Sequence, residues 1–252
     1  MNAVLDHPDL WRARRLVRPE NSSSRSGHPT GFPELDAVLH DGGWPSAGLA
    51  EVLCDTPGVG ELRLLLPALA RLSRSDARWI AWVAPPFTPY APALAGSGID
   101  LERVLLIHPR DRREALWATE QALGSGASSA VLAWLDESGL GLTGIRRLQL
   151  AAKQGRAWAN LFRPAIASAR PSMAELRVLI EDEPSERCDR VGLTVLKRRG
   201  GWATSRLVLE FGQYPVRYEL AALEQRFAFW RGASPGLVQA PAGIRVGAGV
   251  EE

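Results

Sequence analysis

Residues 51–62 read EVLCDTPGVGEL, an apolar run that leads through a glycine-rich turn into the leucine-rich pattern of a helix. Where a buried strand runs into such a turn, the backbone N–H groups of the loop can form a nest for a phosphate. The N-terminus of the following helix adds partial positive charge to that nest. The stretch therefore predicts an α/β fold and marks the place where a nucleotide would bind.

The same loop lacks the two side chains that phosphate binding needs next. A lysine should neutralise the phosphates and a hydroxyl should hold magnesium, but Glu61 and Leu62 stand there. A carboxylate repels a triphosphate, and leucine cannot coordinate a metal. We expect no catalytic residue, no cofactor and no metal, but an ATPase with an unusual loop remains open. The degenerate loop consists of Cys54, Asp55, Thr56, Pro57, Gly58, Val59, Gly60, Glu61 and Leu62.

Strand and helix patterns alternate along most of the chain. Apolar strands buried on both faces read as uninterrupted apolar runs, and the runs here have that form. The rhythm predicts a three-layer sandwich with a mostly parallel central sheet. Strands are expected at 49–53, 79–84, 104–107, 129–135 and 157–162, and helices at 62–72, 113–123 and 142–153, the last with Thr143 as N-cap. Trp79, Trp82 and Trp134 lie on these strands, so we assign them to the core.

The pattern changes after residue 173. Strands at 176–181, 191–198 and 206–211 follow one another with no helix between them, and Gly200-Gly201 supplies a turn. We interpret the three as an antiparallel C-terminal extension of the sheet. A last short helix is expected at 221–230.

The predicted domain organisation has three parts. Residues 1–29 form an N-terminal arm and linker, 30–231 the core domain, and 232–252 a flexible tail rich in Gly, Ala and Pro. An amphipathic piece of the arm either docks on a partner or folds back on its own domain. Its candidate partner-binding residues are Leu10, Trp11, Leu16 and Val17.

Composition places the chain among soluble globular proteins. Apolar residues make up 46% of the 252 residues, the net charge is +2, and no secretory signal or membrane-length apolar run is seen. Two distant cysteines suit a reducing compartment, so we expect a cytoplasmic protein with no membrane contact. Candidate nucleic-acid contacts are Arg110, Arg112, Arg113, Arg198 and Arg199, with a solvated charged face as the alternative.

Several landmarks in order resemble the RecA family. Residues 30–36 read TGFPELD and are followed by Gly42-Gly43 and Glu51, and residues 98–105 read GIDLERVL. The resemblance covers about residues 30–212 and implies a RecA-like core. The segment 163–173, in place of the second DNA-binding loop of that family, is too short for DNA binding in the RecA manner.

Further stretches are similar to the ImuA group of RecA-like proteins. They are 79–86 (WIAWVAPP), 131–135 and 162–165 (FRPA), together with the substituted loop. The resemblance implies a non-catalytic accessory factor of SOS-induced mutagenic translesion DNA synthesis. Its implied partners are an ImuB-like polymerase-family protein, RecA, and indirectly an error-prone DNA polymerase, with at most weak DNA contact. The group is related to SulA, and the alternative is a SulA-like cell-division inhibitor that binds FtsZ.

Overall fold

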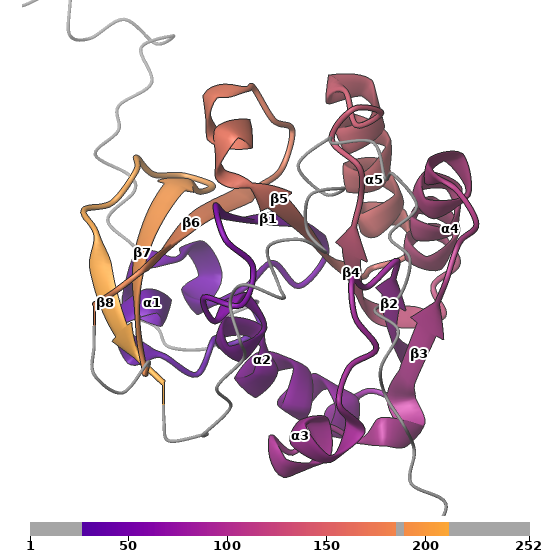
Figure 1. Ribbon diagram of the computed structural model, residues 1–252, viewed down its shortest axis with the longest axis horizontal. Coiled ribbons are helices and arrows are strands. Elements are labelled where there is room, and N and C mark those ends of the chain that lie inside the picture. Colours follow the sequence, from indigo (N-terminus) through magenta and orange to yellow (C-terminus); the bar gives the residue numbers. More distant parts are fainter. Residues whose placement is uncertain (1–26, 185–188, 212–252) are drawn as a thin grey trace, which may run out of the picture.

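The computed structural model describes residues 27–184 and 189–211 of the chain. They form an eight-stranded sheet in the order β3-β2-β4-β5-β1-β6-β7-β8 (Figure 1). Strands β1 to β6 pair in parallel, and β7 and β8 pair antiparallel. The strands are β1 Gly48–Cys54, β2 Trp79–Val83, β3 Val104–Ile107, β4 Ser128–Trp134, β5 Trp158–Pro164, β6 Leu176–Asp182, β7 Arg190–Lys197 and β8 Leu207–Glu210.

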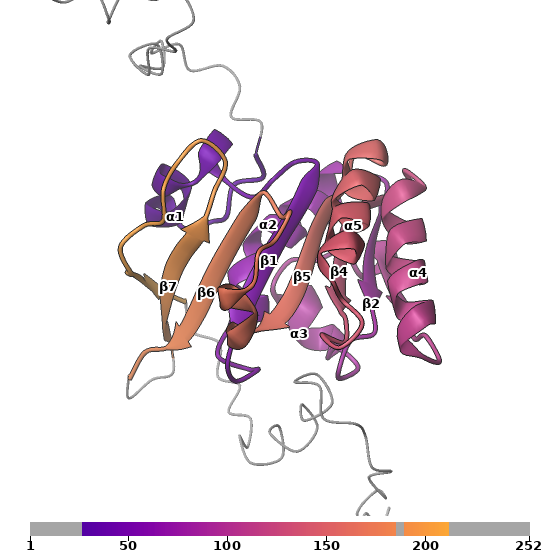
Figure 2. The same ribbon diagram turned by 90° about the horizontal axis from the view of Figure 1, so that it is seen from above.

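Helices cover both faces of this sheet, as Figure 2 shows from above. One face carries α1 (Pro33–Val38), α2 (Glu61–Ser75) and α3 (Ala91–Gly96), and the other carries α4 (Arg112–Gly124) and α5 (Leu142–Gln154). Short 3-10 turns are η3 (His40–Gly42), η4 (Leu101–Arg103) and η5 (Ala165–Ala169). The structure confirms the predicted three-layer α/β sandwich with a mostly parallel sheet.

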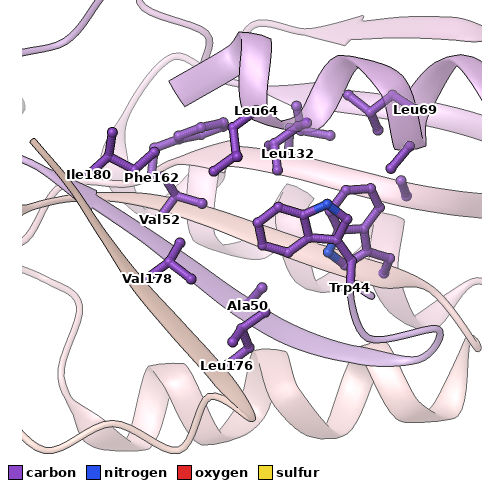
Figure 3. Packing of buried hydrophobic residues seen from close by; sticks show 14 of the residues in the cluster. Trp44, Ala50, Val52, Leu64, Leu69, Leu132, Phe162, Leu176, Val178 and Ile180 are labelled. Carbon is purple, nitrogen blue, oxygen red and sulfur yellow. The ribbon is translucent and has the colours of Figure 1, made fainter. Parts of the chain in front are cut away.

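Strand β1 shows why the strand sequences lack regular polar alternation, although it contains one charged residue, Glu51. All seven of its residues are buried. Ala50 and Val52 face the cluster under α2 that includes Leu64 (Figure 3), whereas Leu49 faces the cluster under α4 and α5. A central strand with helices on both sides has no solvent face, so it has no polar alternation.

The prediction of three antiparallel C-terminal strands was wrong for the first of them. Strand β6 pairs parallel with β1, with Ala50 opposite Leu176, and the antiparallel extension begins only at β7. The chain leaves the end of β5 at Pro164, crosses the sheet through η5 and returns to the beginning of β1. A crossover without a regular α-helix has no helical periodicity in the sequence, so strand spacing alone suggested hairpins.

Two smaller expectations also need correction. Helix α5 begins at Leu142 with Gly141 as its N-cap, so Thr143 lies inside the first turn. Trp79 is 42% exposed because it is the first residue of β2, where the sheet meets solvent. Trp82 and Trp134 are buried as predicted, and their rings stack at 5.7 Å.

Several predictions lie outside the described residues. They concern the arm with Leu10, Trp11, Leu16 and Val17, the helix at 221–230 and the tail at 232–252. Within the residues that the structure describes, no helix combines the length and apolar character needed to cross a membrane. The described ranges also bring no three metal-ligating side chains together.

Candidate functional site

The loop between β1 and α2 has the strand-loop-helix form that its sequence predicts. Strand β1 ends at Cys54, and α2 begins at Glu61 directly after Gly60. Gly60 has a φ of 114°, a conformation that favours glycine. The loop thus delivers its backbone N–H groups to the N-terminus of a fifteen-residue helix.

Those N–H groups already have a partner, the carboxyl group of Glu61. The N–H of Gly58 donates to Glu61 Oε1 and Oε2, each at 2.9 Å, and the N–H of Gly60 donates to Oε2 at 3.2 Å. The sequence predicts that Glu61 repels a phosphate. The structure adds that its carboxyl group lies where an anion would bind a loop of this type.

Burial and hydrogen bonding act on Glu61 in opposite directions. The side chain is nearly inaccessible, and this desolvation raises the pKa of Glu61 above its ordinary value of 4.5. The hydrogen bonds from the loop N–H groups oppose that rise but do not cancel it. The oxygens block the donors whether or not the group is ionised.

Phe211, the residue that follows β8, packs against the same loop. A Cβ at Gly60 would lie only 2.5 Å from Phe211 Cε2, so the ring rests directly on the glycine. Phe32 meets the ring edge-on at 5.7 Å, and Arg63 Cζ stands 4.6 Å from its centroid. Arg63 therefore packs on the aromatic ring. The residues of this site do not fit ATP, which the RecA-like fold otherwise implies.

A second buried polar cluster lies on the α4 and α5 face of the sheet. Arg163 of β5 donates from Nη1 to Glu51 Oε1 at 2.8 Å, and from Nε and Nη2 to the two oxygens of Glu137 at 2.6 and 2.8 Å. Arg177 Nε donates to Glu51 Oε2 at 2.7 Å, and Ser172 Oγ donates to Oε1 at 2.5 Å. Glu51 and Arg163 are at most 1% exposed.

The charges in this cluster balance because each buried ion meets an opposite one. Burial lowers the pKa of Arg163, but the hydrogen bonds and charges of Glu137 and Glu51 more than offset this and raise it overall. Breaking such a buried pair by removing one ion is costly, since the other ion then stays buried without its partner. We call Glu51, Glu137, Arg163 and Arg177 the buried ion cluster.

The cluster also fixes the segment that joins β5 to β6. Arg177 donates from Nη2 to the carbonyl of Ala167 at 2.7 Å and from Nη1 to the carbonyl of Arg170 at 3.1 Å. This is the segment that stands in place of the second DNA-binding loop of the RecA family. It is tied to the sheet and exposes Ile166 and Met173 to solvent.

The candidate arginines lie in two groups that the structure does not bring together. Arg110, Arg112 and Arg113 surround the beginning of α4, while Arg198 and Arg199 follow β7 near the opposite edge of the sheet. Arg112 Nη1 lies 3.2 Å from Asp136 Oδ2 and also contacts Ser138. An open cavity of about 330 Å³ adjoins this pair, lined by Arg112, Arg113, Leu116, Leu135, Asp136 and Ser138. Asp136 therefore offsets part of the charge at the first group.

Sequence reasoning missed most of the residues that close the loop and fix the crossover. Phe211 reaches Gly60 across about 150 positions, and Glu51 meets Arg163 and Arg177 across 112 and 126. No local pattern signals such pairings. The available signals were Glu51 and Arg163, each a lone charge in an apolar strand, because such a charge in a buried strand needs a buried partner.

These features define a RecA-like α/β protein whose phosphate-type loop is filled by its own carboxyl group. A family model described as "Cell division inhibitor SulA" matches residues 49–159, from β1 into β5. The cell division inhibitor SulA of Edwardsiella piscicida is 36% identical over 118 residues, which cover 45% of this chain and 68% of that protein. The chain belongs to the SulA family.

Other relatives match over a similar part of the chain. SulA of Photorhabdus laumondii is 37% identical over 46% of this chain and 63% of that protein, and SulA of Pseudomonas aeruginosa is 37% identical over 38% and 59%. The match thus spans about three fifths of these two proteins. The crystal structure of SulA from Pseudomonas aeruginosa aligns with 32% identity and a TM-score of 0.39, covering 46% of this chain and 97% of that one.

Proposed function

We propose that this chain is a cell-division inhibitor of the SulA type that acts by binding another protein, without nucleotide turnover. The observation that carries the proposal is the carboxyl group of Glu61 on the N–H groups of Gly58 and Gly60. The relatives named above carry the description of cell division inhibitors. The main expectation from the sequence, a translesion accessory role, becomes the second candidate.

The occupied loop favours a role in protein binding over nucleotide hydrolysis. A phosphate would have to displace Glu61 from three hydrogen bonds and move Phe211 off Gly60 before it reached the loop N–H groups. Leu62 would then offer no oxygen to magnesium. A protein built this way has no source of energy from hydrolysis, so its effect on a partner must come from the free energy of association.

The rigid face around the crossover supports a role in protein recognition. Interfaces are most effective when the contact residues are held in place before binding, because less conformational entropy is lost. The buried ion cluster holds the segment 165–174 in this way while Ile166 is 72% exposed. The proposed partner is the division protein FtsZ.

The test is overproduction of the chain in a bacterium together with assays on the purified proteins. We expect cells to grow as filaments without division rings, and purified chain to inhibit FtsZ assembly in proportion to its concentration. Inhibition should be the same with and without ATP. Cells of normal length and FtsZ assembly that is unaffected by excess chain would refute the proposal.

A second candidate is an ImuA-type accessory factor of mutagenic translesion synthesis. The observation that favours it is the part of the fold outside residues 49–159, namely the segment 30–48 and strands β6, β7 and β8. Its proposed partners are an ImuB-like protein and RecA. Deleting the gene should then abolish damage-induced mutagenesis, and the purified chain should retain ImuB but not FtsZ on a column.

A further inference from the structure

The turn between β7 and β8 exposes the most accessible large apolar side chain in the described ranges. Residues 197–202, which we call the hairpin tip, read KRRGGW, and Trp202 is 90% exposed. The tip lies beside α1 at the end of the sheet where β1, β5 and β6 begin (Figure 2). It is outside the residues that match the SulA family model.

The tip is held in one conformation by its own hydrogen bonds. Arg198 Nε donates to the carbonyl of Trp202 at 3.0 Å, and Arg198 Nη1 donates to the carbonyl of Val38 in α1. Gly200 has a φ of 68°, and a Cβ at Gly201 would lie 2.4 Å from Arg198 Nε. The backbone carrying Trp202 is therefore anchored to the core, while its ring stays in solvent.

The charges of the hairpin divide between its base and its tip. At the base, Arg190 pairs with Glu210 at 2.5 Å and Arg206 pairs with Glu183 at 2.5 Å.

At the tip, Lys197 Nζ donates to the carbonyl of Ser172 at 2.8 Å, and Arg198 contacts carbonyls only. Among the described residues, no carboxylate forms an ion pair with Lys197, Arg198 or Arg199. Nearby, Glu175 is paired with Lys153, and Asp41 contacts His40 at 3.4 Å, so at most one uncompensated carboxylate stands near the three cations. The tip therefore carries a net positive charge around an exposed aromatic ring.

We propose that the hairpin tip binds single-stranded DNA, with Trp202 stacked on an unpaired base and the three cations beside the phosphates. An indole ring stacks on any unpaired base, whereas bases of a duplex are already stacked on each other. Uncompensated cations attract the phosphate backbone. A protein partner would need an apolar groove for Trp202, and three cations around the ring suit a polyanion better. This mode does not use the short segment that replaces the RecA-type loop.

The first measurement is fluorescence anisotropy of a labelled oligothymidylate of about 16 nucleotides, titrated with the full chain at low salt. Trp202→Ala should weaken binding by about fivefold to a hundredfold, the range measured for loss of one stacking partner. Trp202→Phe should retain most of the affinity, because phenylalanine still stacks. Trp117→Ala is the matched control, since Trp117 is also exposed, at 60%, but lies on α4.

The second measurement is the salt dependence of the same binding. Arg199→Ala should lower the affinity and reduce the slope of log affinity against log salt by about 0.7, the contribution of one phosphate contact on a single strand. Arg147→Ala is the control, because Arg147 is similarly exposed but paired with Glu120. Duplex DNA of the same length should bind more weakly.

The proposal fails if Trp202→Ala binds as tightly as the unaltered chain, or if duplex and single strand bind equally. It also fails if oligouridylate is strongly preferred, since the proposed contacts are base stacking and phosphate pairing and make no use of the ribose 2′-hydroxyl. Filamentation and FtsZ assembly do not enter these assays. Failure here is therefore distinguishable from failure of the proposed function.

Discussion

The loop 54–62 and the hairpin tip 197–202 are both glycine-containing turns with charged side chains, but the loop is covered by the protein and the tip is exposed to solvent. In the loop, the charged side chain turns inward onto the backbone N–H groups and Phe211 covers it. At the tip, Lys197 and Arg198 donate to carbonyl groups, and Trp202 is 90% exposed to solvent. Whether a charged turn is available for a ligand depends on whether its groups are already satisfied within the protein.

The largest expected effect on stability concerns the buried ion cluster, whose Glu51 lies on β1 just before the loop 54–62. Arg163→Met removes the cation that faces both Glu51 and Glu137, so it should lower the free energy of unfolding by about 3–5 kcal/mol. Urea unfolding followed by circular dichroism measures the change. Arg147→Met is the control, because its exposed pair with Glu120 should contribute at most about 1 kcal/mol. Similar losses for both variants would show that the cluster does not hold the crossover.

The next effect concerns the ring that covers the loop. Phe211→Ala removes a side chain that is 6% exposed and packs on Gly60, Phe32 and Arg63, so it should destabilise the protein by about 3 kcal/mol. Phe211→Leu should recover most of that loss. Urea unfolding of both variants measures these changes. An alanine variant as stable as the parent would mean that the packing of Phe211 on the loop does not stabilise the protein.

A smaller effect is expected in the pH dependence of stability. Burial raises the pKa of Glu61 above 4.5, so the folded state binds its proton more tightly than the unfolded state does. This contribution is fully present below 4.5 and is lost as the pH rises through the folded-state pKa. Compared with Glu61→Gln, the parent should therefore become relatively less stable as the pH rises over this interval.

Unfolding curves of the parent and Glu61→Gln at several pH values provide the comparison. A parent that gains stability relative to the variant with rising pH would mean that the loop N–H bonds outweigh burial and lower the pKa of Glu61.

The smallest effect on stability is expected at the hairpin tip. Trp202→Ala removes a ring that is 90% exposed, so the free energy of unfolding should change by no more than about 0.5 kcal/mol. A loss of 2 kcal/mol or more would show that the ring has a structural role, and the contrast between the two turns would no longer hold. Thermal melting of the variant is sufficient to decide.

The sequence was informative where local periodicity and a single backbone motif decide the structure. The strands 49–53 and 129–135 and the helix 62–72 were placed within a few residues of β1, β4 and α2. It failed for β6, because the direction of that strand depends on a crossover that packs on β1.

The candidate site was predictable only in part. Glu61 and Leu62 showed that the loop is degenerate, since their chemistry can be judged in place. The reach of Phe211 to Gly60 and of Arg177 to Glu51 depends on contacts between distant segments. The exposure of Trp202 depends on the hydrogen bonds that hold the hairpin tip, and the amino-acid composition does not predict these bonds.

The central claim is that the loop 54–62 holds the carboxyl group of Glu61 in place of a phosphate. Thermal melting of the purified chain with and without magnesium-ATP at millimolar concentration tests it most directly, because a ligand that binds only the folded state raises the midpoint. The account predicts the same midpoint in both samples. A rise of several degrees with magnesium-ATP would contradict it, because Glu61 would then have to leave the loop N–H groups to a phosphate.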